Sequence, residues 1–374
     1  MKFAFCIFKY HSHGGLQLDM MRMAHEAVKR GHKVVIFAGE WRGDLPDVKH
    51  IEVSLVPLRS FSNHGRAAEY QHKVLALIAH GNFDLSVAFN RIGGCDLYFA
   101  ADNCVAEQWS KKHCELLLKI LPRYRIFMRL EKAVFSPESN SKIMYITPGQ
   151  KESYMRYYGT AANRFELLPP GIDEKFRNTC NLAALRTQKR AELRLAPDEF
   201  MLILIGASHL GKGRDLAVAA VAGLPEAKRR QCKLYLVGGP VNCEALQLAE
   251  KLKITNQVIS LGDSDEIQSL LAAADLMIHP ARNEATGTVL LEAMACGVPI
   301  LCSDCCGFKN YVLESGNLVW PMNDDPQGLS AMLNCALEHL PELRSTTIKY
   351  AETSDFYQRA AKAVDLMENL CSGK

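Results

Sequence analysis

No long apolar run occurs in this sequence, and its net charge is small. No stretch approaches the roughly 20 consecutive apolar residues that a membrane-spanning helix requires. The apolar segment near the start is short and is followed by Lys9 and His11, so no signal peptide is predicted. We therefore expect a cytoplasmic protein, unless it lies on a membrane surface. The formal net charge of +3 does not indicate a nucleic-acid-binding protein, and any basic function must be local.

Signals for a disulfide framework or a zinc site are also missing. The chain has 13 cysteines, an odd number, scattered through apolar segments, as at Cys6, Cys232 and Cys302. This usage is typical of buried thiols in a reducing compartment. Cys302 and Cys305 have the C-x-x-C spacing, but no second pair follows at a zinc-like distance. We also expect no D-x-D pair at a strand end that could hold a divalent ion, and therefore no metal site.

Strand-like and helix-like patterns alternate along the 374 residues, with no internal repeat beyond that alternation. This length is sufficient for two domains, and the alternation predicts an α/β fold with parallel sheets. Residues 168–173 contain the Pro-Pro-Gly sequence that is typical of a linker. We therefore expect a first domain over residues 1–168, a second over 169–350 and a closing helix over 351–374.

The chain opens with a strand, a turn at Gly14 and Gly15, a helix and a second strand. This β-α-β unit is Rossmann-like but lacks the G-x-G-x-x-G pattern, so a dinucleotide oxidoreductase is not favoured. A Gly-Gly turn lets the backbone approach a bound ligand closely. The alternative is that the two glycines serve only as a packing turn.

Residues 275–304 have the strongest pattern, which predicts a strand, a polar loop, a helix that ends at Gly297, and another strand. Glu284 lies in the loop, and Glu292 lies eight positions later in the helix. A helix N-terminus binds phosphate through its unpaired amides and dipole. Carboxylates accept hydrogen bonds from sugar hydroxyls. Each glutamate alone would be read as a solvated charge, but together the features predict a nucleotide-sugar site.

Two further charged side chains follow predicted strands. Lys212 lies between two glycines after the strand at 200–205 and can reach a diphosphate as a point charge. Asp102 lies at the carboxyl end of another strand, the edge where ligands bind in open α/β sheets. The alternatives are a solvated loop lysine and a helix N-cap.

Residues 109–135 are basic and amphipathic. Only Glu115 and Glu131 offset their positive charge. Such a segment suits an anionic membrane surface, and the alternative is a pair of helices with a solvated basic face. Its basic residues are Lys111, Lys112, Lys119, Arg123, Arg125, Arg129 and Lys132.

The spacing of Glu284 and Glu292 resembles the E-x7-E motif of retaining glycosyltransferases with the GT-B architecture. The segments HGGLQLDMMRMA, LPPGID and GTVLLEAMACGVPI strengthen the match, which covers nearly the full length. Taken together, the chain resembles the lipopolysaccharide core glucosyltransferases. The resemblance implies two Rossmann-like domains facing a cleft, with the acceptor on the first domain, the donor on the second, and a last helix that crosses back.

The resemblance also implies the reaction and its residues. Glucose would pass from UDP-glucose to an inner-core heptose of lipopolysaccharide without a metal ion, near the cytoplasmic face of the membrane, and Asp102 would orient or deprotonate the acceptor hydroxyl. Glu284 would bind the hexose, Glu292 the ribose, and Lys212 the diphosphate. The remaining donor-binding residues would be Gly14, Gly15, Ala285, Gly287 and Thr288.

The chain departs from this family at two positions. The family commonly has an arginine beside Lys212 and another after the glycine equivalent to Gly262. This chain has Gly211 and Asp263 there, with His209 and Arg214 as the basic side chains nearest Lys212. The alternatives that stay open are another nucleotide sugar or glycolipid acceptor, a nucleotide-sugar epimerase, and a membrane-surface binding protein without activity.

Overall fold

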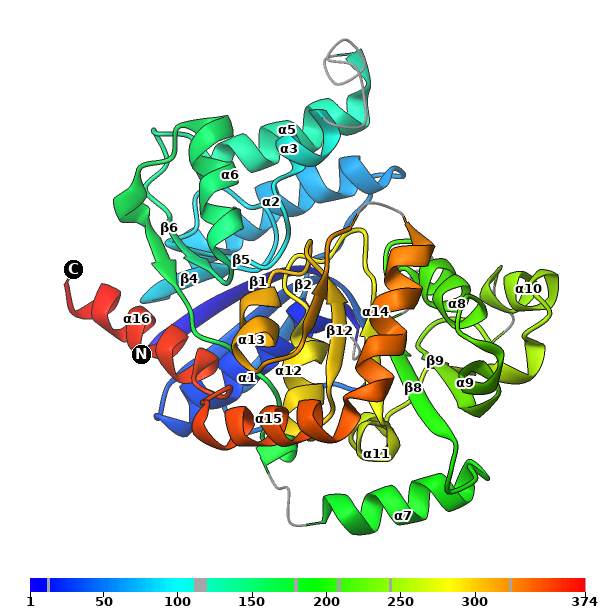
Figure 1. The fold of residues 1–374 in the computed structure, drawn as a ribbon. Helices are drawn as coiled ribbons and strands as arrows, with labels where there is room; N and C mark the ends of the chain where they lie inside the picture. The colour runs from blue at the N-terminus through cyan, green and yellow to red at the C-terminus, as the bar shows by residue number, and fades with distance from the viewer. Residues whose placement is uncertain are drawn as a thin grey trace. The chain divides into compact units, whose positions relative to one another are not determined.

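The computed structural model describes residues 1–11, 14–110, 120–177, 181–206, 210–241, 244–322 and 325–373. Its contacts divide the chain into two compact units (Figure 1). The first unit comprises Met1–Gly171 and Tyr357–Lys374, and the second comprises Ile172–Phe356. Within the described residues each unit holds one parallel β-sheet with helices packed around it, as the alternating pattern predicts.

The first unit has a seven-stranded sheet in the described residues, with the order β3-β2-β1-β4-β5-β6-β7 and every pair parallel. Its inner strands are largely apolar because helices cover the sheet; Phe3 to Ile7 of β1, for example, are fully buried. The strands are β1 Lys2–His11, β2 Lys33–Arg42, β3 Ile51–Leu55, β4 Leu85–Ala88, β5 Leu97–Ala100, β6 Lys142–Tyr145 and β7 Phe165–Leu167.

The helices of the first unit form two groups (Figure 1). Helices α1 and α16 lie side by side, and α2, α3, α5 and α6 pack against one another. Arg30, which follows α1, joins the first group because its guanidinium contacts Asp365 at 2.7 Å and Glu368 at 3.0 Å. The helices are α1 Gly15–Lys29, α2 Asn63–His80, α3 Val105–Ser110, α5 Pro122–Phe135, α6 Pro148–Tyr158, the 3-10 turn η1 Ala162–Arg164, and α16 Arg359–Ser372.

A buried ion pair holds α16 to α1. Arg359 donates from Nη1 to Asp19 Oδ2 at 2.8 Å, and both residues are more than nine-tenths buried. Arg22 also lies 3.3 Å from the other oxygen of Asp19. Arg359 donates further to the carbonyl of Pro169 at 3.2 Å, just before the chain leaves the first unit. The pair therefore fixes the returning helix where the chain enters and leaves this unit.

The second unit has a six-stranded sheet in the described residues, with the order β10-β9-β8-β11-β12-β13. Its core lies between this sheet and the helices α8 and α14, with Trp320 and Leu333 fully buried. The strands are β8 Phe200–Ile205, β9 Cys232–Val237, β10 Val258–Gly262, β11 Leu276–His279, β12 Ile300–Ser303 and β13 Leu318–Trp320. The helices are η2 Glu174–Arg177, α7 Leu182–Glu192, α8 Arg214–Ala222, α9 Glu226–Gln231, α10 Glu244–Lys251, η3 Thr255–Gln257, α11 Ile267–Ala273, α12 Thr288–Ala295, α13 Lys309–Glu314, α14 Pro326–Glu338 and α15 Leu340–Thr353.

The predicted strand, loop, helix and strand over residues 275–304 is confirmed as β11, a loop, α12 and β12. Gly297 ends α12 with a φ of 68°, the left-handed conformation expected of a helix-ending glycine. The single closing helix expected over residues 351–374 is divided between two helices in the structure. Helix α15 extends to Thr353, buried Phe356 interrupts the pattern, and α16 begins only at Arg359. None of the helices in the described ranges has the length and apolarity needed to cross a membrane.

We expect Asp19→Ala to lower the free energy of unfolding by about 3 kcal/mol, because it leaves the Arg359 guanidinium buried without its carboxylate. Urea-induced unfolding followed by circular dichroism measures this loss. The matched control is Lys29→Ala on the same helix, whose side chain is 81% exposed; we expect a change within about 0.5 kcal/mol. Equal effects of the two substitutions would contradict a stabilising ion pair.

Candidate functional site

The carboxylate of Glu284 lies in the loop after β11 and is held by two basic side chains. Lys212 Nζ forms an ion pair with Glu284 Oε2. His279 Nε2 lies 3.1 Å from the same oxygen. The Glu284 side chain is only 11% exposed, so it is not a solvated surface charge. The structure thus brings together two residues that the sequence singled out separately, Lys212 and Glu284, and adds a third, His279.

The loops that carry Lys212 and Glu284 are fixed against each other. They follow the neighbouring strands β8 and β11. The amide of Arg282 donates to the carbonyl of Gly211 at 3.0 Å, and its guanidinium binds both oxygens of Asp215 at 2.8 and 2.9 Å. Gly213 has a φ of 69°, and a Cβ there would lie 1.9 Å from the carbonyl oxygen of Pro280. Only glycine permits this close approach.

The charge state of Glu284 follows from these contacts. Burial alone raises the pKa of a carboxyl group because it penalises the charged form. Here the hydrogen bond and charge of His279, together with Lys212, outweigh burial and lower the pKa of Glu284 from 4.5 to about 2. Glu284 is therefore an ionised hydrogen-bond acceptor at neutral pH and cannot serve as a general acid.

Helix α12 begins directly after this loop. The backbone amides of its first turn are the groups that can bind an anion. Its N-cap residue is Gly287, with a φ of 85°, and no side chain caps the first turn. Ala285 and Thr288 lie on either side of this glycine and are partly exposed. Glu292 lies four residues after Thr288, which places the two on the same face of the helix about 6 Å apart along its axis. Gly287, Thr288 and Glu292 thus lie at the start of one helix or within it, directly after the loop that carries Glu284.

The basic residue nearest to Lys212 in sequence among the described residues, Arg214, does not supply a second phosphate-binding charge. Arg214 is 1% exposed and donates to the carbonyls of Gly206, Val237 and Gly238. It joins the ends of β8 and β9 and cannot face a ligand. His209 lies outside the described residues.

Asp263 stands where the resembled family has an arginine, and its carboxylate binds the backbone of a neighbouring turn. Its Oδ1 accepts a hydrogen bond from the amide of Gly239 at 2.7 Å. Gly238, Gly239 and Gly262 all have positive φ. The Asp263 carboxylate therefore stabilises the glycine turns at the ends of β9 and β10. The expectation that no D-x-D pair stands at the end of a strand is wrong, because Asp263 and Asp265 have this spacing directly after β10. No group of three or more potential metal ligands occurs within the ranges that the structure describes.

In the first unit the two glycines before α1 differ from each other. Gly14 is the N-cap residue, and a Cβ there would lie 1.9 Å from Gln17 Oε1. A Cβ on Gly15 would meet nothing within 4 Å. A side chain at Gly14 would have to displace the end of the Gln17 side chain, whereas Gly15 has open space around it among the described residues. The two residues before Gly14 lie outside the described residues.

Asp102 lies just after β5, and the structure excludes the helix-capping alternative for it. The amide of Val105, which begins α3, donates to Glu131 Oε1 and Oε2 at 3.0 and 2.9 Å. Glu131 is fully buried and also accepts from Arg91 Nε at 2.9 Å. Arg91 in turn lies 3.4 Å from Asp102 Oδ2, and the Asp102 side chain is 54% exposed. The residue that caps α3 is therefore Glu131 of α5, which lies 26 positions after Val105, so no local sequence pattern could reveal it.

All the exposed charged side chains of helix α5 are basic. Its one acidic residue, Glu131, points inward, whereas Arg123, Arg125, Arg129 and Lys132 are exposed. Trp109 covers part of the other face through edge contacts with Tyr124 and Phe127. Lys111, Lys112 and Lys119 of the predicted basic segment lie outside the described residues.

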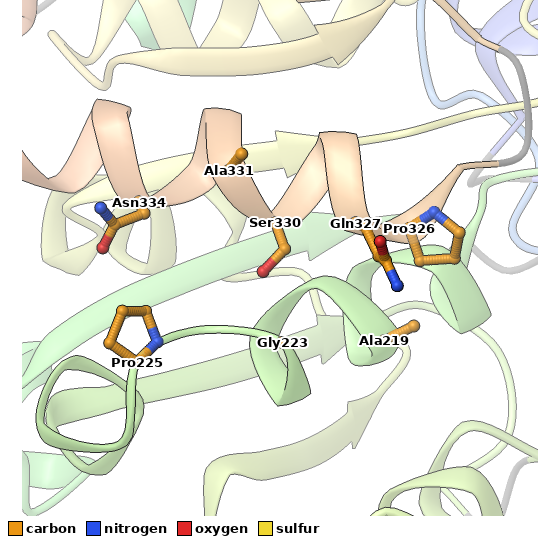
Figure 2. Close-up of a pocket in the computed structure, with 8 residues that line it drawn as sticks. All are labelled: Ala219, Gly223, Pro225, Pro326, Gln327, Ser330, Ala331 and Asn334. Atoms are coloured by element: carbon orange, nitrogen blue, oxygen red, sulfur yellow. The ribbon is translucent and has the colours of Figure 1, made fainter.

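A separate groove of about 330 Å³ lies between the end of α8 and the side of α14 (Figure 2). Ser330 donates to the carbonyl of Ala220 at its floor. None of its lining residues carries a charge or belongs to the constellation around Glu284, so the groove is not part of this site. The lining residues are Ala219, Gly223, Pro225, Pro326, Gln327, Ser330, Ala331 and Asn334.

Comparison with known families and structures gives matches over nearly the full length. Residues 186–354 match the model of the group 1 glycosyl transferases, and residues 13–176 match that of glycosyltransferase family 4. The chain is 35% identical over 370 residues to the lipopolysaccharide glucosyltransferase WaaG of Escherichia coli (strain K12), an alignment that covers 97% of this chain and 98% of the relative.

Solved structures agree with these matches. A crystal structure of WaaG, described as a glycosyltransferase involved in lipopolysaccharide biosynthesis, has a TM-score of 0.91 and 34% identity, over 98% of this chain and 99% of that one. The Anabaena protein Alr3699/HepE, solved in complex with UDP and glucose, has a TM-score of 0.75 over the full length of both chains. At 18% identity, that second likeness shows the fold alone.

The depressed pKa of Glu284 predicts a stability difference that depends on pH. We expect Glu284→Gln to cost about 3 kcal/mol of unfolding free energy at pH 7, from the pKa shift of the carboxylate. Because the folded-state pKa lies below the unfolded value, this difference should persist above about pH 5 and vanish as the pH falls toward 2. Urea unfolding at a series of pH values measures it. The control is Glu226→Gln, an exposed glutamate, and a difference independent of pH would contradict the prediction.

Proposed function

Because this chain belongs to the group 1 glycosyl transferases with the GT-B fold, we propose that it transfers glucose from UDP-glucose to an inner-core heptose of lipopolysaccharide. The family and the fold class are those implied by the resemblance that the E-x7-E spacing and its accompanying segments carry. The Escherichia coli relative, 35% identical over 97% of the chain, is a lipopolysaccharide glucosyltransferase, which supports glucose and lipopolysaccharide as substrates. The alternative within the same fold is another nucleotide sugar or another glycolipid acceptor.

The observation that carries the proposal is the ionised, buried carboxylate of Glu284 beside the uncapped start of α12. In the proposed complex, Glu284 accepts hydrogen bonds from hydroxyls of the hexose, and Glu292 accepts them from the ribose. A charged acceptor forms stronger hydrogen bonds than a neutral one, and its burial excludes competing water. The depressed pKa supports this role over acid–base catalysis.

The diphosphate would bind Lys212 and the backbone around Ala285, Gly287 and Thr288. Negative charge develops on this leaving group as the glycosidic bond breaks, so fixed donors there lower the barrier most. Lys212 pairs with Glu284 in the present structure. Donor binding would therefore move the ammonium group from the carboxylate to the phosphates, which carry more negative charge. Retention of configuration at the sugar carbon is taken from the family resemblance.

In the first unit we assign the acceptor to the region of Asp102. Its exposed carboxylate is oriented by Arg91, and it would accept the proton of the attacking hydroxyl or orient that hydroxyl. Gly15, with open space where a side chain would lie, and Gly14 before it would let the backbone approach the donor's phosphates and sugar. The transfer is proposed to need no metal ion.

The exposed basic face of α5 supports a place on a membrane surface. Four cationic side chains project from one helix with no exposed acidic residue between them. Each Lys or Arg near an anionic bilayer contributes about 1 kcal/mol of attraction. A lipid-linked acceptor requires the enzyme to work at such a surface. We therefore propose peripheral binding at the cytoplasmic face of the membrane through residues 109–135.

The proposed reaction predicts acceptor-dependent release of UDP. Purified protein is incubated with UDP-glucose, UDP-galactose, UDP-N-acetylglucosamine, GDP-mannose or ADP-heptose, with and without heptose-terminated lipopolysaccharide core and with a chelator control. We expect release from UDP-glucose only when the core is present, unaffected by the chelator. Glu284→Gln should lower turnover about 100-fold, as for loss of a charged hydrogen-bond partner, and Glu226→Gln should not.

Other outcomes of this experiment redirect or reject the proposal. Release from another nucleotide sugar would keep the transferase and change its donor. Free sugar or an epimer formed without an acceptor would indicate an epimerase instead. No release from any donor would reject the enzymatic function.

The proposed membrane contact predicts a charge-dependent affinity. We expect the triple variant Arg123→Gln, Arg125→Gln, Arg129→Gln to bind anionic phospholipid vesicles about 100-fold more weakly, from the loss of three surface cations. Vesicle sedimentation at fixed ionic strength measures the affinity. The matched control replaces three exposed cations of the second unit, Arg230, Lys251 and Lys253, by glutamine. Equal losses in both triple variants would show that net charge, and not α5, determines binding.

A further inference from the structure

His279 is the last residue of β11 and is fully buried within the second unit. It pairs in register with Cys302 of the neighbouring strand β12. Nothing in the E-x7-E pattern assigns it a role. Its Nε2 nevertheless lies 3.1 Å from Glu284 Oε2, at the centre of the proposed hexose site. Because an ionised carboxylate can only accept, the proton of this hydrogen bond belongs to Nε2.

The two partners of Glu284 act on a single oxygen. Lys212 Nζ and His279 Nε2 both contact Oε2. Within the described part of the chain, Oε1 makes no hydrogen bond. One oxygen of the carboxylate is therefore held by the protein, and the other is left to accept hydrogen bonds from a ligand.

The two partners are not equivalent. Lys212 extends from a loop on a flexible side chain that is 27% exposed, whereas the His279 ring is 0% exposed and attached to the sheet. Its Nδ1 has no hydrogen-bond partner in the described residues, so the contact with Glu284 is the ring's one polar interaction there. When Lys212 turns to the diphosphate, His279 is the partner that stays with the carboxylate.

We infer that His279 is a positioning residue that fixes Glu284 Oε2 and thereby directs Oε1 at the hydroxyls of the transferred hexose. This inference rests on the proposed role of Glu284 in binding the hexose. It has a specific consequence, because the nucleotide alone does not use Glu284. Loss of His279 should weaken recognition of the sugar and leave recognition of UDP intact.

The experiment compares the affinities of the full-length protein for UDP-glucose and for UDP by titration calorimetry. We expect His279→Leu to weaken binding of UDP-glucose about 10- to 100-fold, as for loss of a hydrogen bond to a charged group, and to leave UDP within about twofold. His279→Gln should recover most of the loss, because its side-chain amide can donate from nearly the position of Nε2. Cys302→Ala, at the register partner in β12, is the matched packing control and should keep the wild-type ratio of the two affinities.

Glu284→Gln separates this inference from the function on which it rests. If Glu284→Gln loses the preference for UDP-glucose over UDP and His279→Leu keeps it, the positioning role is wrong and the role of Glu284 stands. If His279→Leu weakens both ligands equally, or if His279→Gln recovers nothing, His279 has only a structural role and the inference is overturned. If Glu284→Gln also keeps the preference, Glu284 does not bind the hexose, and both proposals are rejected.

Discussion

The ion pair between Glu284 and Lys212 is the interaction on which the candidate site depends. Burial by itself raises the pKa of the Glu284 carboxyl group, and the contacts with His279 and Lys212 outweigh it and lower the pKa to about 2. These partners lie at the ends of adjacent strands, and their loops can meet only because Gly213 has no side chain where the carbonyl of Pro280 lies. The close contact of the two loop backbones thus allows Lys212 to reach Glu284 and to help lower the pKa of its carboxyl group.

Several charged residues near this site are engaged in holding the backbone. Arg214 binds the carbonyls at the ends of β8 and β9, Arg282 binds Asp215, and Asp263 holds the Gly239 turn. Lys212, by contrast, contacts the side chain of Glu284 among the described residues. It can therefore exchange this partner for a ligand near the start of α12. In the proposed donor complex, backbone amides and the helix dipole would therefore supply much of the stabilisation of the diphosphate.

In the first unit a single buried carboxylate connects two features of different kinds. Glu131 lies on α5, whose outer face is basic, and its oxygens bind the start of α3 and Arg91, the partner of Asp102. A buried charge is stable only when its partners are in place. The helix assigned to the membrane surface and the carboxylate assigned to the acceptor are therefore parts of one polar network.

The sequence by itself determined the α/β class, the strand, loop, helix and strand around Glu284, and the glycosyltransferase family. Apolar periodicity and helix-ending glycines, which are local patterns, indicated the class and these elements, and the resemblance to the E-x7-E glycosyltransferases indicated the family. Only the tertiary structure decided which groups meet. Lys212 and Glu284 are 72 positions apart, Glu131 caps a helix 26 positions earlier, and Arg359 pairs with Asp19 over 340 positions. Such contacts depend on the order of strands in each sheet, which places β8 beside β11, and no local pattern of residues encodes that order.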